Sequence, residues 1–234
     1  MPLQIVRNDI TRMQVDIIVN AANRHLSVGS GVCGAIHKAA GPQLERDCRL
    51  LGGCPTGSAV VTAAYALPCQ YVIHAVGPIW QGGHQGEPEA LRSCYRKSLE
   101  LAVAHHCQSI AFPLIATGGF GYPKEEGMRI AVDEINAFLF KHSMFIYLVV
   151  FDRESPRLGQ NLYPDLKAYI DQNYVSEKIE KEINNNMDLD IGCIIFENAD
   201  RYFSSKYNAE FFVKWLNENI NPNIKIIFHF SKFA

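Results

Sequence analysis

Short apolar runs rich in β-branched residues recur along the first two thirds of the chain, and longer segments with helical spacing lie between several of them. Runs of this kind are typical of buried strands, whereas apolar positions three and four residues apart are typical of helices. The pattern predicts strands at Val15–Val19, Val60–Thr62, Tyr71–Val76, Ile110–Ile115 and Phe145–Phe151. It predicts helices at Ala35–Leu51, Glu89–His106 and Lys124–His142.

Strands that alternate with helices favour an α/β fold built on a largely parallel sheet. A further strand-like run follows directly after the first residues, Met1 to Gln4. No internal repeat is present. The first part of the chain is therefore predicted to form one α/β domain.

The composition changes near residue 175. After Gly159 the only glycine is Gly192, and Asn, Ile, Lys and Phe become common. The stretch INNNMDLD at Ile183–Asp190 is typical of a linker. The runs IGCIIF and IKIIFHF predict strands, and Ala209–Asn219 predicts a helix. We therefore expect a domain at residues 1–174 and a C-terminal extension at 175–234, either a small α/β unit or part of a second domain.

Charge and composition limit the partners. The 234 residues include 22 Lys and Arg against 24 Asp and Glu, a net charge of -2. This balance disfavours a nucleic-acid surface or a polybasic membrane anchor, and no apolar stretch is long enough to cross a bilayer. An anionic ligand would have to be held by local geometry.

The cysteines give no sign of a metal or redox motif. The chain has 7 cysteines, an odd number, and none is spaced as C-x-x-C. Because the N-terminus does not look like a signal peptide, we expect a cytoplasmic protein. We also expect a monomer with no metal and no cofactor.

Two glycine loops follow predicted strands and lead into helical patterns. GSGVCGAIHKAAG spans Gly29–Gly41, and ATGGFGYP spans Ala116–Pro123. In a parallel α/β sheet both loops are expected at the carboxyl edge, where ligands bind. Glycine allows backbone N–H groups to approach an anion closely, and a following helix favours negative charge. Either loop alone could be an ordinary turn, but the pair favours a diphosphate. Neither matches a P-loop or a Rossmann fingerprint.

Several motifs in a fixed order resemble those of macrodomains. These are NDITRMQVDIIVNAAN, GVCGAIHKAAG, CPTGSAVVT, YVIHAVGPIW and ATGGFGYP. The chain looks most like the bacterial and MacroD-type branch, whose members bind ADP-ribose and often hydrolyse its esters. The resemblance covers about residues 3–173. It implies a three-layer α/β/α fold with a mixed, mostly parallel sheet.

The resemblance also implies roles for individual residues. Asp9 would accept a hydrogen bond from the adenine amino group, and the backbone of Ile10 would contact the ring beside it. Phe151 would pack on the adenine. Asn20 and Asn23 would lie near the distal ribose, with Asn23 contacting its hydroxyls. Carboxylates suit amine donors, and amides suit vicinal hydroxyls.

The same resemblance places the two glycine loops against the diphosphate. Phe120 would border the distal ribose as well. The matching residues of the first loop are Gly29, Ser30, Gly31, Val32 and Gly34. Those of the second are Thr117, Gly118, Gly119, Phe120 and Gly121.

Cys33 departs from the family pattern, because the related enzymes have an aspartate there that is thought to activate water. Three interpretations remain open. Hydrolysis could proceed without the aspartate, as in viral macrodomains with an apolar residue at this position. The domain could be a reader that binds ADP-ribose without chemistry. Cys33 could itself act as a thiolate, since a helix N-terminus lowers the pKa of a thiol.

We expect a hydrolase that acts on mono-ADP-ribosylated proteins or O-acetyl-ADP-ribose, with a reader as the alternative. The candidate catalytic residues are Asn20, Asn23 and Cys33, the last as a residue that fills the place of the aspartate. His25 and His37 lie near the first loop, but helix histidines are usually solvated or packed.

Overall fold

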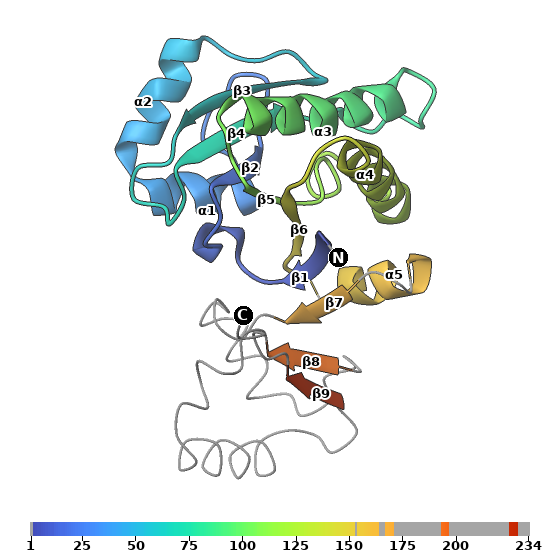
Figure 1. Cartoon of the computed structure of the whole chain (residues 1–234). Helices are drawn as coiled ribbons and strands as arrows, with labels where there is room; N and C mark the ends of the chain where they lie inside the picture. The colour runs from blue at the N-terminus through green and yellow to red at the C-terminus, as the bar shows by residue number, and fades with distance from the viewer. Residues whose placement is uncertain (1, 153, 164–166, 171–192, 197–224, 229–234) are drawn as a thin grey trace, which may run out of the picture. The chain divides into compact units, whose positions relative to one another are not determined.

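The computed structural model describes residues 2–152, 154–163, 167–170, 193–196 and 225–228 (Figure 1). The chain divides into two compact units, Met1–Ala168 and Tyr169–Ala234. In the second, β8 (Cys193–Phe196) and β9 (Lys225–Phe228) pair in parallel, which confirms the two strands predicted there. The predicted helix at Ala209–Asn219 lies outside the described residues, and the domain boundary at residue 174 stays a prediction.

A sheet organises the first unit, in which six strands lie in the order β3-β4-β2-β5-β6-β1, and β7 extends past Ala168, where this unit ends. The pairs β4–β2, β2–β5, β5–β6 and β6–β1 are parallel, and β3–β4 is antiparallel. The predicted mixed, mostly parallel sheet is therefore confirmed. The strands are β1 (Leu3–Arg7), β2 (Ile17–Ala21), β3 (Ser58–Ala63), β4 (Tyr71–Val76), β5 (Ser109–Phe112), β6 (Phe145–Val150) and β7 (Lys167–Ile170).

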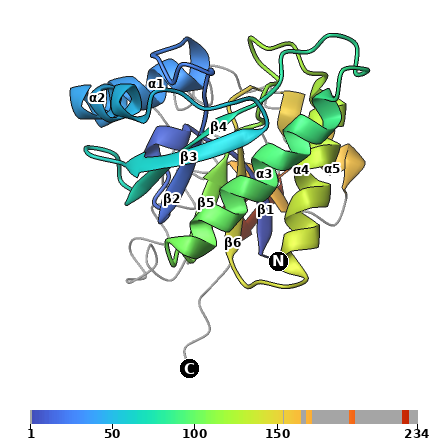
Figure 2. The same cartoon turned by 90° about the horizontal axis from the view of Figure 1, so that it is seen from above.

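Helices cover both faces of this sheet (Figure 2). One apolar core joins the sheet to α3 and α4, and the other joins its opposite face to α1 and α2. This arrangement confirms the three-layer α/β/α fold. The helices are α1 (Gly31–Ala40), α2 (Pro42–Leu51), α3 (Glu87–Ala104), α4 (Lys124–Leu139) and α5 (Glu154–Leu162), with a 3-10 turn at Ile10–Arg12.

Successive side chains of a strand point to opposite faces of a sheet, and β2 shows the result. Ile17 and Val19 lie in the core under α3 and α4, whereas Ile18 lies in the core under α1 and α2. Asn20 therefore shares the face of Ile18. This alternation places a polar side chain inside an apolar layer.

The single helix predicted at Ala35–Leu51 is wrong, because the structure divides it into α1 and α2. Gly41 has a φ of 88°, and Pro42, which has no N–H group, begins α2. The strand predicted to reach Ile115 ends at Phe112, before Pro113. The sequence reading did not anticipate α5 or β7.

The described part of the chain contains free cysteines and no helix suited to span a membrane. Six of its cysteines are free thiols: Cys33, Cys48, Cys54, Cys69, Cys94 and Cys107. None of its helices is long and apolar enough to span a membrane.

The buried carboxylate of Glu87 organises the loop that supports the second glycine loop. It accepts hydrogen bonds from the backbone N–H groups of Gln81 and Gly83, at 3.0 and 3.1 Å, and from that of Gln85. In the same segment, the N–H of Trp80 donates to the carbonyl oxygen of Phe120 at 2.9 Å. The Glu87 carboxylate thus stabilises the chain on which the Phe120 loop rests.

This arrangement predicts an acid-dependent loss of stability. Backbone N–H groups, first that of Glu87 itself and then those of Gln85, Gly83 and Gln81, lower the pKa of this carboxyl. Because folding lowers the pKa of this carboxyl, its ionisation stabilises the fold at pH values above the pKa of a free glutamate, about 4.3. This contribution is lost as the pH falls through the pKa of the folded state. In urea unfolding, Glu87→Gln should therefore be less stable than the wild type at pH 7, with the difference shrinking in acid.

Glu89→Gln provides the matched control, because Glu89 lies on the same helix with an exposed side chain. It should change the free energy of unfolding little at either pH. A wild-type advantage over Glu87→Gln that persists unchanged at pH 3 would contradict this account.

Candidate functional site

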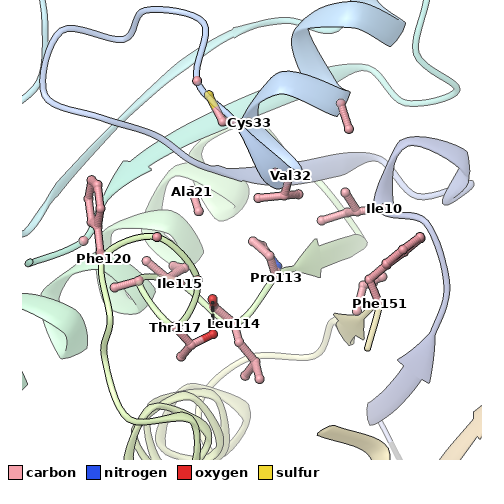
Figure 3. A pocket seen from close by; sticks show the side chains of 18 of the residues that line it. Ile10, Ala21, Val32, Cys33, Pro113, Leu114, Ile115, Thr117, Phe120 and Phe151 are labelled. Carbon is pink, nitrogen blue, oxygen red and sulfur yellow. Dashed lines mark hydrogen bonds between the residues drawn. The ribbon is translucent and has the colours of Figure 1, made fainter. Parts of the chain in front are cut away.

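The carboxyl ends of four neighbouring parallel strands, β2, β5, β6 and β1, open into one cleft of about 640 Å³ (Figure 3). Residues 8–10 follow β1, residues 29–33 precede or begin α1, and residues 113–120 follow β5. The end of β6 adds residues 149–152. Both glycine loops therefore lie at the same sheet edge, as expected. A cleft of this volume suits a small organic ligand.

The first loop presents unpaired N–H groups at the start of α1. In the described structure the backbone N–H groups of Gly31, Val32 and Cys33 donate to no backbone carbonyl. The cap residue Ser30 gives them no side-chain bond either. The first N–H groups of a helix have no partner within it and favour an anion. This loop is thus a ready anion site.

Close packing within the first loop requires a glycine at position 34. A Cβ there would lie 2.5 Å from the carbonyl oxygen of Gly29. Gly34 does not line the cleft. Its role is to let the loop fold back onto α1, which aims the N–H groups of residues 31–33.

The second loop presents a similar set of unpaired backbone N–H groups. Gly118 and Gly119 are exposed, and the N–H groups of Gly118, Gly119 and Phe120 have no hydrogen-bond partner in the described residues. Gly121, at φ 72°, donates its N–H to the carbonyl oxygen of Gly118 at 2.9 Å and closes the turn. Gly121 thus shapes the loop from outside the cleft. A Cβ at Gly118 or Gly119 would meet nothing within 4 Å, so a ligand can approach their backbone.

Asp9, Ile10 and Phe151 come together at one end of the cleft, and Figure 3 shows Ile10 and Phe151 far from Phe120. The Oδ1 atom of Asp9 accepts the N–H of Thr11 at 2.9 Å and its hydroxyl at 2.7 Å. Its Oδ2 atom has no hydrogen bond within the described part of the chain. Phe151 is 43% exposed, although a phenylalanine that ends a strand is usually part of a core. This end offers a carboxylate acceptor beside an aromatic face.

Asn23 lies at the opposite end and is held firmly by its own loop. Its Oδ1 accepts the N–H groups of His25 and Ser27 at 3.1 and 3.2 Å, and the Ser27 hydroxyl at 3.1 Å. Its Nδ2 donates to the Ser27 carbonyl at 2.8 Å. An amide nitrogen has two hydrogens, so one remains for a ligand.

Cys33 also lines this end, with 5% of its surface exposed. Its Sγ lies 3.7 Å from the carbonyl oxygen of Ser27 and 3.6 Å from Nδ2 of Asn20. A carbonyl oxygen only accepts hydrogen bonds, so this contact needs the proton of the thiol. The geometry therefore favours a thiol over a thiolate at Cys33.

The structure brings most of the predicted site residues together. Asn20, Gly34 and Gly121 do not line the cleft, and Asn20 is fully buried behind Cys33. Sequence reasoning missed Asn8, Leu114 and Asp152, which follow strand ends, and His74, which contacts Asn20 from β4. The predicted residues that line the cleft are Asp9, Ile10, Asn23, Gly29, Ser30, Gly31, Val32, Cys33, Thr117, Gly118, Gly119, Phe120 and Phe151.

One buried cluster beneath the cleft has the residue types of a metal site. The ligand atoms of His37, Cys48 and His74 lie within 4.8 Å of one another. Both ring nitrogens of His74 already have partners, however: Nδ1 contacts Asn20 at 3.1 Å and Nε2 contacts Thr62 at 3.0 Å. Coordination would have to break one of these hydrogen bonds. The cluster is therefore better described as packed polar groups.

Burial keeps the cluster neutral. It lowers the pKa of His74 to about 4, with a smaller effect of the same sign from His37. It raises the pKa of the Cys48 thiol to about 11. At neutral pH the layer beneath the cleft thus has no charged imidazole and no thiolate at these two positions.

Comparison with known proteins agrees with this geometry. Residues 19–131 match the model of the Macro domain family. A macro domain-containing protein of Methanosarcina mazei is 52% identical over 155 residues, which are 65% of this chain and 83% of that protein. The O-acetyl-ADP-ribose deacetylase of Citrobacter rodentium is 49% identical over 166 residues, 68% of this chain and 94% of that enzyme.

Solved structures show the same fold. The Oceanobacillus iheyensis macrodomain with ADP has a TM-score of 0.65 at 40% identity and covers 68% of this chain and 88% of its own. The Trypanosoma brucei macrodomain in complex with ADP-ribose has a TM-score of 0.65 at 38% identity and covers 68% of each chain. With its sheet, its two glycine loops and these relatives in agreement, the chain belongs to the macro domain family.

Proposed function

We propose that this protein binds ADP-ribose in the cleft and hydrolyses an ester at the distal ribose. One observation carries the proposal: two sets of unpaired backbone N–H groups, at residues 31–33 and 118–120, line one cleft. Two such sets suit the two phosphates of a diphosphate. The adenine then lies at the end with Asp9 and Phe151, and the distal ribose lies at the end with Asn23 and Cys33.

The diphosphate needs no basic side chain in this arrangement. The described residues that line the cleft include no lysine or arginine. Backbone N–H groups and the positive end of α1 supply the electrostatic attraction instead. This explains how a chain with a net charge of -2 can bind an anion.

The distal end contains no carboxylate that could activate water. The only carboxylates that line the described cleft are Asp9 and Asp152, which follow the ends of β1 and β6. In the proposed reaction a phosphate oxygen of the ligand and the remaining Nδ2 hydrogen of Asn23 orient the attacking water. Loss of a general base costs a factor of about 10² to 10⁴ in rate, so hydrolysis should be slow.

The lack of a carboxylate at the distal end of the described cleft favours one alternative, a reader that binds ADP-ribose without chemistry. The deacetylase among the relatives supports hydrolysis, whereas the thiol at position 33 supports the reader. Catalysis by a Cys33 thiolate is disfavoured by the Ser27 carbonyl beside its sulfur. The substrates to test are therefore O-acetyl-ADP-ribose and a protein mono-ADP-ribosylated on glutamate.

Asp9→Asn should weaken ADP-ribose binding about tenfold or more, measured by calorimetry. The substitution leaves an oxygen to cap the 3-10 turn but replaces the free acceptor with an amide donor, which opposes the adenine amino group. A hydrogen bond to a charged group contributes about 1.5–3 kcal/mol.

A hypoxanthine analogue provides the control for this variant. It has a carbonyl oxygen in place of the amino group, so Asp9→Asn should bind it more tightly than the wild type does. Equal losses for both ligands would show that Asp9 does not contact the base.

Asn23→Ala should abolish the release of ADP-ribose from a glutamate-linked substrate, because it removes the donor that orients the water. Cys33→Asp should increase the rate, since a carboxylate at this position can act as a base. Release is measured by separating free ADP-ribose from the modified protein. ADP-ribose affinity, measured in parallel, separates loss of chemistry from loss of binding.

Cys33→Ser tests the thiolate directly. A serine hydroxyl can still donate to the Ser27 carbonyl, so the rate should change little. A loss as large as that of Asn23→Ala would identify Cys33 as the nucleophile. Tight binding by a wild type that releases nothing, with release by Cys33→Asp, would identify the protein as a reader.

A further inference from the structure

Three polar side chains form a buried row on the sheet face beneath α1 and α2. Asn20 of β2 and His74 of β4 are directly paired in the parallel register, and Thr62 lies on the adjacent strand β3. Asn20 and His74 are 0% exposed and Thr62 is 8% exposed. Buried polar groups are costly unless they are hydrogen-bonded, so their bonds constrain one another.

The hydroxyl of Thr62 determines which nitrogen of His74 carries the proton. Its Oγ1 donates its single proton to the carbonyl oxygen of Ala63 at 3.1 Å. Toward Nε2 of His74, at 3.0 Å, Oγ1 can then only accept. With the Thr62 proton on Ala63, His74 is protonated at Nε2 and Nδ1 keeps a lone pair.

That lone pair orients the amide of Asn20. Nδ1 of His74 accepts a hydrogen from Nδ2 of Asn20 at 3.1 Å. The other hydrogen of Nδ2 is directed at Sγ of Cys33, at 3.6 Å. In this orientation Oδ1 of Asn20 is buried without a hydrogen-bond partner among the described residues. In the opposite orientation Oδ1 would face the Nδ1 lone pair and could accept only from the Cys33 thiol.

The row is connected to the cleft through Cys33. With Asn20 donating to the sulfur, the thiol proton is directed at the Ser27 carbonyl, 3.7 Å away. The same carbonyl accepts Nδ2 of Asn23 at 2.8 Å. A continuous network thus runs from buried Thr62 to the Asn23 side chain at the distal end of the cleft.

We infer that His74 is a positioning residue for the distal-ribose end of the site. In its Nε2-protonated form it orients the Asn20 amide, and through Cys33 it supports the Ser27 carbonyl to which Asn23 donates. The structural part, the hydrogen-bond network from Thr62 to Asn23, does not depend on the proposed activity. The catalytic part rests on the proposed hydrolysis, in which Asn23 orients the water.

Nitrogen-15 NMR tests the structural part on the full chain. Wild type should show His74 protonated at Nε2 only at neutral pH. Thr62→Val removes the hydroxyl that fixes this form and should shift the His74 nitrogens together with the side-chain amides of Asn20 and Asn23. Ser98→Ala removes another buried hydroxyl, bonded to the Cys94 carbonyl on α3, and should leave all three unchanged.

Kinetics test the catalytic part. His74→Phe removes the acceptor and should lower kcat for ester hydrolysis about tenfold, the value of one hydrogen bond, with little change in KM. His74→Asn keeps an acceptor near the position of Nδ1 and should recover most of the loss. The kcat of the double variant Asn20→Ala/His74→Phe should lie within about twofold of the kcat of Asn20→Ala alone, because His74 acts through Asn20.

Each contrary result would overturn a different part of the proposal. A wild-type His74 protonated at Nδ1, or unmoved amides in Thr62→Val, would overturn the network. Equal losses in His74→Asn and His74→Phe, or additive losses with Asn20→Ala, would reduce His74 to a packing residue. A wild type that binds or hydrolyses nothing would overturn the proposed function, while the NMR result would still decide the structural part.

Discussion

Parallel pairing of β2, β5, β6 and β1 is the constraint on which the site depends. It brings the carboxyl ends of four strands to one edge, so the loops that follow them must share one cleft. The N–H groups of residues 31–33 and 118–120 have no partner among the described residues, which leaves them available to an anion. The sheet thus positions the proposed diphosphate site, which has no basic side chain among its described residues.

The same sheet also places polar groups where an apolar layer would pack more simply. Asn20, His74 and Thr62 occupy core positions under α1 and α2, where hydrogen bonds join them in a row. This network extends to Cys33 and Asn23, which border the distal end of the cleft. In the proposed function, the loop backbone therefore contributes the binding strength, and the buried side-chain row contributes to the geometry of the reacting end.

Much of this could be predicted from the sequence. Alternating strand and helix patterns, two glycine loops and the ordered motifs indicated the fold, the cleft and thirteen of its residues. Other features depend on tertiary structure. Gly41-Pro42 divides α1 from α2, although helical spacing continues across it. His74 looks like one more residue of an apolar strand until the register places it beside Asn20. Gly34 and Gly121 act through packing and turn closure, which their spacing alone could not distinguish from ligand contact.

Titration of the full chain with ADP-ribose, followed by its backbone amide NMR spectrum, tests the central claim most directly. A charged acceptor shifts the proton signal of each amide that donates to it. We expect the largest downfield shifts from the two unpaired sets, Gly31, Val32 and Cys33 on one wall and Gly118, Gly119 and Phe120 on the other. Shifts confined to one set would reduce the site to a single phosphate. Saturable binding that leaves both sets unchanged would contradict the account.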